Sequence, residues 1–143
     1  MVSVAILIVM ALGAVAANRL TTSSVTINQL RTKANTMSVE AMEIVLSMRA
    51  ENFLGLTTGI FHPEFEGSSW NLAEGPEVIG PFTRSIVITP VQRNLVCFTA
   101  VCDITPQGGV TDIGSMNVEV KVAWVQSSAP KEITLSSLIT YWR

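Results

Sequence analysis

The first seventeen residues, MVSVAILIVMALGAVAA, carry no charge, and the chain turns polar at Asn18 and Arg19. As an α-helix this segment would extend roughly 25 Å, slightly less than the hydrocarbon core of a bilayer, which is about 30 Å thick. A segment this apolar does not lie on the surface of a soluble domain. We therefore expect residues 1–17 to lie in lipid, in a signal sequence or inside an assembly. The side chains expected to line this apolar helix are Val4, Ala5, Ile6, Leu7, Ile8, Val9, Met10, Leu12, Gly13 and Val15.

Residues 18–54 continue without Pro or Gly, and their apolar residues recur at alternating steps of three and four. This spacing places them on one stripe of a helix, which favours an amphipathic helix packed on its own domain over a coiled coil. A helix from Met1 to about Phe53 would be roughly 80 Å long. The remaining residues would form a globule with a radius of gyration of about 12 Å, so we expect the apolar half to project. The residues of the stripe expected to pack on a sheet are Ile27, Leu30, Met37, Ile44 and Met48.

Residues 55–143 show the alternation of strands. The clearest run places Val118, Val120, Val122 and Trp124 on one buried face. Residues 55–81, rich in Gly and Pro, are expected to form a connecting region with short strands near 59–61 and 70–72. A change of parity at Ser136–Ser137 predicts a bulge or a bend in the last strand. The pattern therefore predicts an α+β fold with a long N-terminal helix packed on a small antiparallel sheet, divided into segments 1–17, 18–54 and 55–143.

The apolar N-terminus and three later segments resemble type IV pilins and pseudopilins. These segments are GPFTRSIVITPV (80–91), VEVKVAWVQ (118–126) and ITLSSLITYWR (133–143), which are similar to minor pilins of the type IV pilus modification kind. In that family a cleavage-site glycine, a methylated first residue and a glutamate precede the apolar helix. Their counterparts would lie upstream of Met1, and we expect the sequence as written to start downstream of them.

The resemblance implies a pilin-like fold and a structural subunit, a minor pilin more than a major one. Such a subunit is first held in the bacterial inner membrane by its single apolar helix. It then joins an extracellular filament in which the apolar helices bundle. The implied partners are other pilin subunits, the inner membrane, a prepilin peptidase, a platform protein and, indirectly, an assembly ATPase.

Two alternative functions remain open. The chain would also suit a pseudopilin of a type II secretion system. Ala14-Val15-Ala16 resembles a signal-peptide cleavage site, which would instead indicate a secreted or membrane-anchored binding domain. N-terminal sequencing distinguishes this last function, because cleavage there or one residue later gives a chain that starts near Asn18.

Composition and motifs argue against several kinds of chemistry. Nine basic and eleven acidic residues leave a net charge of −2, which does not favour nucleic acid as a partner. We expect no catalytic site and no cofactor, because the sequence contains no catalytic or cofactor-binding motif. We expect no metal site either: the acidic residues of 64–77 lack the spacing of a calcium loop, and Asp103 and Asp112, nine residues apart, are a weak calcium signal for which a hairpin turn is the default interpretation.

Three kinds of side chain deserve separate expectations. Cys97 and Cys102 are predicted to form a disulfide, as suits an extracytoplasmic domain. Trp70 is the aromatic residue best placed for adhesion, although a core position is the simpler expectation for tryptophan. Arg84 shares parity with Phe82 and Ile86 and is expected to point partly inward. It would then either pair with a helix glutamate such as Glu43 or lie at the edge of the sheet.

Overall fold

The structure is a computed structural model that describes the backbone of residues 2–94 and 103–141, and the side chains of Val25, 27–94 and 103–141. One α-helix, α1 (Val2–Asn52), is followed by a short 3-10 helix, η1 (Phe53–Gly55). The side chain of Asn52 ends α1 by accepting a hydrogen bond from the Gly55 N–H. The chain forms two compact units, Met1–Lys33 and Ala34–Arg143, so the last part of α1 belongs to the unit that contains the strands.

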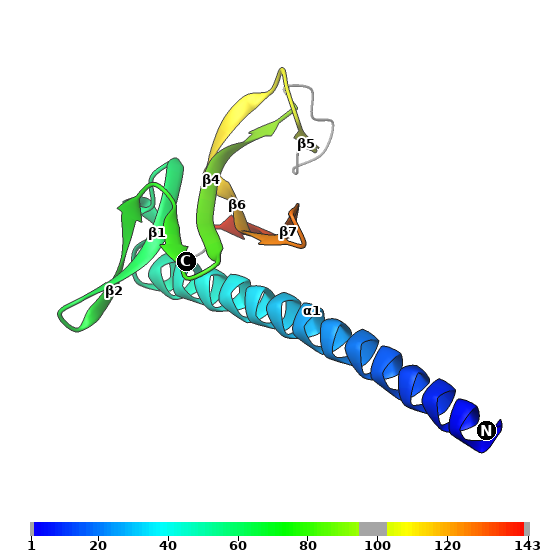
Figure 1. Ribbon diagram of the computed structural model, residues 1–143. Helices are drawn as coiled ribbons and strands as arrows, with labels where there is room; N and C mark the ends of the chain where they lie inside the picture. Colours follow the sequence, from blue (N-terminus) through cyan, green and yellow to red (C-terminus); the bar gives the residue numbers. More distant parts are fainter. Residues whose placement is uncertain (1, 95–102, 142–143) are drawn as a thin grey trace. The chain divides into compact units, whose positions relative to one another are not determined.

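Seven strands of the described chain form one antiparallel sheet (Figure 1). Its main path runs β2-β1-β4-β6-β7, while β3 and β5 both pair with β4. The strands are β1 (Gly59–Glu66), β2 (Ser69–Glu74), β3 (Glu77–Ile79), β4 (Phe82–Arg93), β5 (Ile104–Thr105), β6 (Val110–Gln126) and β7 (Ala129–Thr140).

The expected fold, a long helix packed on a small sheet, is wrong. The sheet has seven strands, the longest of which has 17 residues, and only the part of α1 from Ala34 onward shares its compact unit. Residues 55–81 contain more strand than expected, because β1 and β2 are longer than the two short strands predicted there and β3 is an additional strand. The glycines there lie between strands: Gly67, Gly75 and Gly80 all have the positive φ that tight turns require.

The core lies between α1 and one face of the sheet. Ala41, Met42 and Val45 of the helix pack with apolar side chains of β1, β4, β6 and β7. The strand members of this cluster are Phe61, Ile86, Ile88, Val118, Val120 and Ile139. Each strand reaches the core with alternate residues, as the pleat of a sheet requires.

Of the bulge or bend predicted at Ser136–Ser137, the bulge is wrong, because the register between β6 and β7 is unbroken from Ala129 to Thr140. Ser137 takes a half-buried inward position there, and Leu138 turns outward with 45% of its surface exposed. The irregularity lies instead in β4, where the register against β6 shifts between Pro90 and Val91. Proline has no N–H to give to a neighbouring strand, so a break in the ladder is favoured at this position.

Candidate functional site

The apolar segment of the sequence forms the first turns of α1. Its backbone is helical from Val2, and all ten predicted lining positions between Val4 and Val15 fall within the helix. The side chains of 1–24 are outside the described residues. Among the residues whose side chains are described, no helix is both long enough and apolar enough to cross a bilayer. A membrane span at 1–17 therefore stays a prediction from the sequence.

The predicted packing residues divide between the two units. In the unit Ala34–Arg143, Met37 and Ile44 are buried and Met48 is partly buried against the core. On the sheet, Val118, Val120, Val122 and Trp124 are all buried. Ile27 and Leu30 belong to the unit Met1–Lys33, where Ile27 is 39% exposed and Leu30 is intermediate. Packing of Ile27 and Leu30 on the sheet therefore stays a prediction from the sequence.

The buried stripe of α1 is wider than the sequence spacing indicated. Ser38, Met42 and Val45 are buried as well, so neighbouring positions of each turn contribute. Part of this signal was present in the sequence, since the apolar residue Val45 directly follows the predicted stripe residue Ile44. A search for apolar positions does not find Ser38, because serine is polar. Its burial is tolerated because its Oγ donates a hydrogen bond to the Asn35 carbonyl of the same helix at 2.8 Å.

Arg84 of β4 connects the helix to the sheet inside this core. Its side chain is 5% exposed, and both Nε and Nη2 lie 2.6 Å from Glu77 Oε1 on β3. Nη1 donates to the Met37 carbonyl of α1 at 3.2 Å and lies 3.9 Å from Glu40 Oε2. The predicted inward direction of Arg84 is therefore observed, but its acidic neighbours are Glu77 and Glu40 instead of Glu43.

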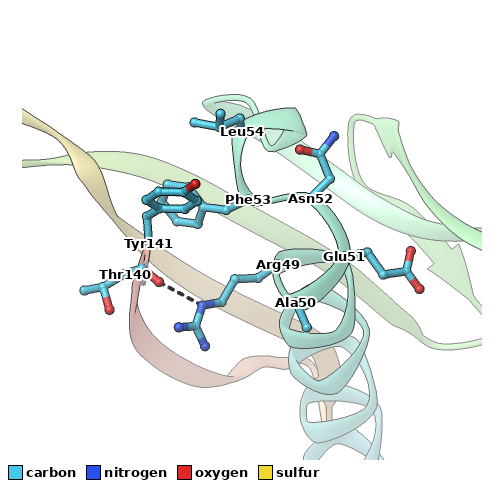
Figure 2. A pocket seen from close by; sticks show the side chains of 8 residues that line it. All are labelled: Arg49, Ala50, Glu51, Asn52, Phe53, Leu54, Thr140 and Tyr141. Carbon is cyan, nitrogen blue, oxygen red and sulfur yellow. Dashed lines mark hydrogen bonds between the residues drawn. The ribbon is translucent and has the colours of Figure 1, made fainter. Parts of the chain in front are cut away.

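A hollow of about 430 Å³ lies where α1 ends beside β7 (Figure 2). Arg49 extends across it and its Nε donates to the Thr140 carbonyl at 2.9 Å. The rings of Phe53 and Tyr141 lie side by side, with centroids 5.6 Å apart. Its lining residues are Arg49, Ala50, Glu51, Asn52, Phe53, Leu54, Thr140 and Tyr141.

The polar contacts in this hollow connect elements of the fold. Arg49 joins the last turn of α1 to the end of β7, and Asn52 ends the helix through Gly55. Both contacts therefore attach the end of the helix to neighbouring elements of the fold.

A second polar cluster occupies the distal part of β4 and β6, beyond the irregularity. Arg93 Nε donates to Asp112 Oδ2 at 2.6 Å, and its Nη2 donates to Ser115 Oγ at 3.3 Å. The other carboxylate oxygen of Asp112 accepts from the Gly114 N–H at 2.9 Å. The hydrogen bond from Arg93, followed by those from Ser115 and Gly114, lowers the pKa of Asp112 below its usual value.

These contacts bear on the weak calcium signal at Asp103 and Asp112. The carboxylate of Asp112 is paired with the guanidinium of Arg93, and the backbone carbonyl of Asp103 accepts a hydrogen bond from the Asn94 N–H. Within the part of the chain that the structure describes, no group of three His, Cys, Asp or Glu side chains is placed to hold a metal ion. Cys97 and Cys102, the predicted disulfide, are outside the described residues.

The tryptophans have different surroundings. Trp124 is buried, with its ring centroid 6.1 Å from that of Phe82. Trp70, by contrast, is 40% exposed and meets Phe65, itself 60% exposed, edge to face across the β1–β2 hairpin, with centroids 5.1 Å apart. This aromatic pair lies on the same face of the hairpin as the buried Phe61. Trp142 is outside the described residues.

Comparison with protein-family models, with curated proteins and with solved structures finds no match to this chain. The function must therefore be argued from the residues and their arrangement.

Proposed function

We propose that this chain is a structural subunit, most similar to a minor pilin, of a bacterial type IV filament or a related machine. The observation that carries the proposal is the unbroken helix Val2–Asn52, which joins an uncharged segment directly to a helix that contributes to the core of the sheet. A single continuous helix thus connects the apolar segment, residues 1–17, with the unit Ala34–Arg143, which is called the head below.

The uncharged segment has the composition that helix bundling needs. Outside lipid, its apolar side chains are kept from water only by other apolar surfaces, which copies of the same helix supply. Small residues at Ala5, Gly13 and Ala17 permit close approach of neighbouring helices. Transfer from an inner membrane to a filament would then exchange one apolar environment for another.

The contacts of the head are those of a part that must stay attached to its helix. Arg84 joins the helix to β3 and β4 through Glu77 and the Met37 carbonyl, and Arg49 joins the helix end to β7. A force applied along α1 would be resisted by these contacts and by the apolar core. The proposal therefore assigns a structural role and no reaction.

The proposed function implies a location and a set of partners for the subunit before and after assembly. Before assembly it would be held in the inner membrane by residues 1–17, and afterwards it would lie in an extracellular filament with other pilin subunits. Processing by a prepilin peptidase and assembly by a platform protein and an ATPase follow from the resemblance in sequence.

The test is fractionation of producing cells, followed by immunogold electron microscopy of sheared surface filaments. We expect the intact chain in the membrane fraction and antibody label along filaments. Leu7→Lys, which places a charge in the apolar segment, should abolish both, whereas Thr83→Lys on the exposed face of the head should leave both unchanged. An intact chain that stays a dissolved monomer without detergent overturns the proposal, and a mature N-terminus near Asn18 would favour the secreted binding domain.

A further inference from the structure

β7 forms one edge of the sheet, and within the described residues it pairs with β6 alone. The Tyr141 N–H donates to the Gly114 carbonyl at 2.8 Å, which continues the β6–β7 register by one residue. Hydrogen-bonded and non-hydrogen-bonded residues alternate along an antiparallel pair. The odd-numbered residues of β7 therefore bond to β6. The N–H and C=O groups of Thr134, Ser136 and Leu138 point the other way, toward the free edge.

An independent contact supports this assignment. Thr140 is even-numbered, and its carbonyl accepts from Arg49 Nε, on the side away from β6. Arg49 thus covers one end of the free edge. Near the other end, Pro130 has no N–H to offer a further strand.

The edge between these two ends lacks the usual protection against strand pairing. From Ile133 to Ile139 it contains no charge, no proline and no irregularity of register. Natural proteins normally interrupt such an edge with charges, prolines or bulges, because its backbone groups are ready to accept another strand. Here the charges Lys131 and Glu132 lie only at the Pro130 end.

We propose that this edge pairs antiparallel with β7 of a second copy of this chain, around a two-fold axis at Ser136. The uncharged stretch Ile133–Ile139 extends three residues to either side of Ser136. In this register it therefore pairs over its full length with the same stretch of the second copy. Ser136 then faces Ser136, and Thr134 faces Leu138 in both directions. All three pairs use only outward-pointing backbone groups.

The side chains suit this register on both faces. On the face toward α1, Ile133 of one copy lies opposite Ile139 of the other, and Leu135 lies opposite Ser137. On the other face, the exposed Leu138 is covered by Thr134. A register one step nearer the turn, centred on Thr134, would set Pro130 against Leu138 and Lys131 against Ser137. It would thus place a missing N–H and a charge within the pairing.

The proposal rests on residues of the unit Ala34–Arg143 alone. It adds a contact between heads to the proposed function, and its failure would leave helix bundling and the membrane anchor untouched.

The test is oxidative cross-linking of the full chain in detergent micelles. Directly opposed residues of hydrogen-bonded pairs have Cα atoms about 5.5 Å apart, within the range that a disulfide spans. Ser136→Cys should therefore link to itself, giving a disulfide between two copies of the tryptic peptide 132–143. This peptide contains neither native cysteine, so its identification by mass spectrometry is unambiguous.

Matched variants fix the register. Thr134→Cys and Leu138→Cys, which lie on the same face, should not link alone but should link to each other when the two variants are mixed. Adding Ser136→Lys to both should abolish that link, since two like charges then face each other, while circular dichroism shows the head still folded. Self-linking of Thr134→Cys, or no linking of Ser136→Cys, overturns the proposal.

Discussion

At the scale of single residues, the most consequential group is the Arg84 guanidinium in the core. A buried charge is tolerated when it is paired and hydrogen-bonded, and here Glu77 provides the close partner while the Met37 carbonyl accepts a further bond. Arg84 therefore depends on β3, a strand of only three residues. Parity in the sequence indicated that Arg84 points inward, but a pairing between residues of different elements carries no periodic signal.

Removing the partner of Arg84 should destabilise the head. We expect Glu77→Ala to lower the free energy of unfolding by about 3 kcal/mol, because it leaves a buried cation with only the more distant Glu40. Glu74→Ala, at an exposed position at the end of the preceding strand, should change it by less than about 0.5 kcal/mol. Urea unfolding of the full chain in detergent, followed by tryptophan fluorescence, measures both. Equal midpoints for the two variants would contradict the assigned role of Glu77.

The cluster around Asp112 should make stability depend on pH. Its pKa is lowered in the folded chain, so the folded state favours the ionised carboxylate. The resulting stabilisation is present above the unfolded pKa and is lost as the pH falls through the folded pKa. We expect Asp112→Asn to cost about 1–3 kcal/mol at pH 7 and much less at acid pH, where wild type is protonated as well.

Thermal unfolding from pH 7 down to pH 2 measures this difference for Asp112→Asn against Asp103→Asn. Asp103→Asn is the matched control, because the hydrogen bond from the Asn94 N–H to its backbone carbonyl survives the substitution. A gap between wild type and Asp112→Asn that stays constant with pH would exclude the assigned ion pair.

At the scale of elements, α1 and the strands differ in how well their patterns predict them. The period of three and four marks the buried side of α1, and strict alternation marks the side of β6 that the core buries. The two short strands expected near 59–61 and 70–72 lie within β1 and β2, but both strands are longer than expected and β3 was not expected. Pro63 is buried in β1 although it cannot donate to a neighbouring strand. Pairing partners and the position of the bulge depend on tertiary contacts, which local pattern does not encode.

The buried face of α1 can be tested with adjacent residues. Val45 is fully buried, whereas Leu46 is 37% exposed on the next position of the helix. Val45→Ala should lower the free energy of unfolding by about 2 kcal/mol through loss of apolar contact and the cavity left behind. Leu46→Ala should cost less than about 0.5 kcal/mol. Urea midpoints of both variants provide the measurement. A larger loss of stability for Leu46→Ala than for Val45→Ala would contradict the assigned buried face of α1.

The turn between β6 and β7 offers a stabilising substitution. Ser127 and Ser128 have φ values of 50° and 66°, which side chains other than Asn and Gly adopt at a cost. These are the two central residues of a turn for which Asn-Gly is preferred. The double variant Ser127→Asn/Ser128→Gly should raise the free energy of unfolding by about 1 kcal/mol.

Differential scanning calorimetry should show a higher melting temperature for this double variant. Ser68→Gly, in the β1–β2 turn at a residue without positive φ, serves as the control and should give no increase. A lower melting temperature for Ser127→Asn/Ser128→Gly would show that the serine side chains contribute more than the backbone conformation costs.

At the scale of the whole chain, the two compact units carry different kinds of information. For Met1–Lys33 the argument for function comes from composition, because seventeen consecutive uncharged residues restrict the environments in which the segment is stable. For Ala34–Arg143 it comes from tertiary contacts that could not be read from the sequence, above all the bond between Arg49 and Thr140 and the unpaired edge of β7. The expected fold failed in this second unit, where the contribution of residues 55–81 was underestimated.

The core also has a consequence for how fast the head is acquired. It gathers Val45 of the helix and Ile139 of the last strand into one cluster, so its assembly must close a loop that contains most of the chain. Folding rates fall as native contacts become more distant in sequence, because conformational entropy is lost in closing the loop before the contacts contribute favourable free energy. The head should therefore reach its native state only after β7 has left the ribosome, later than a helical bundle of equal length would.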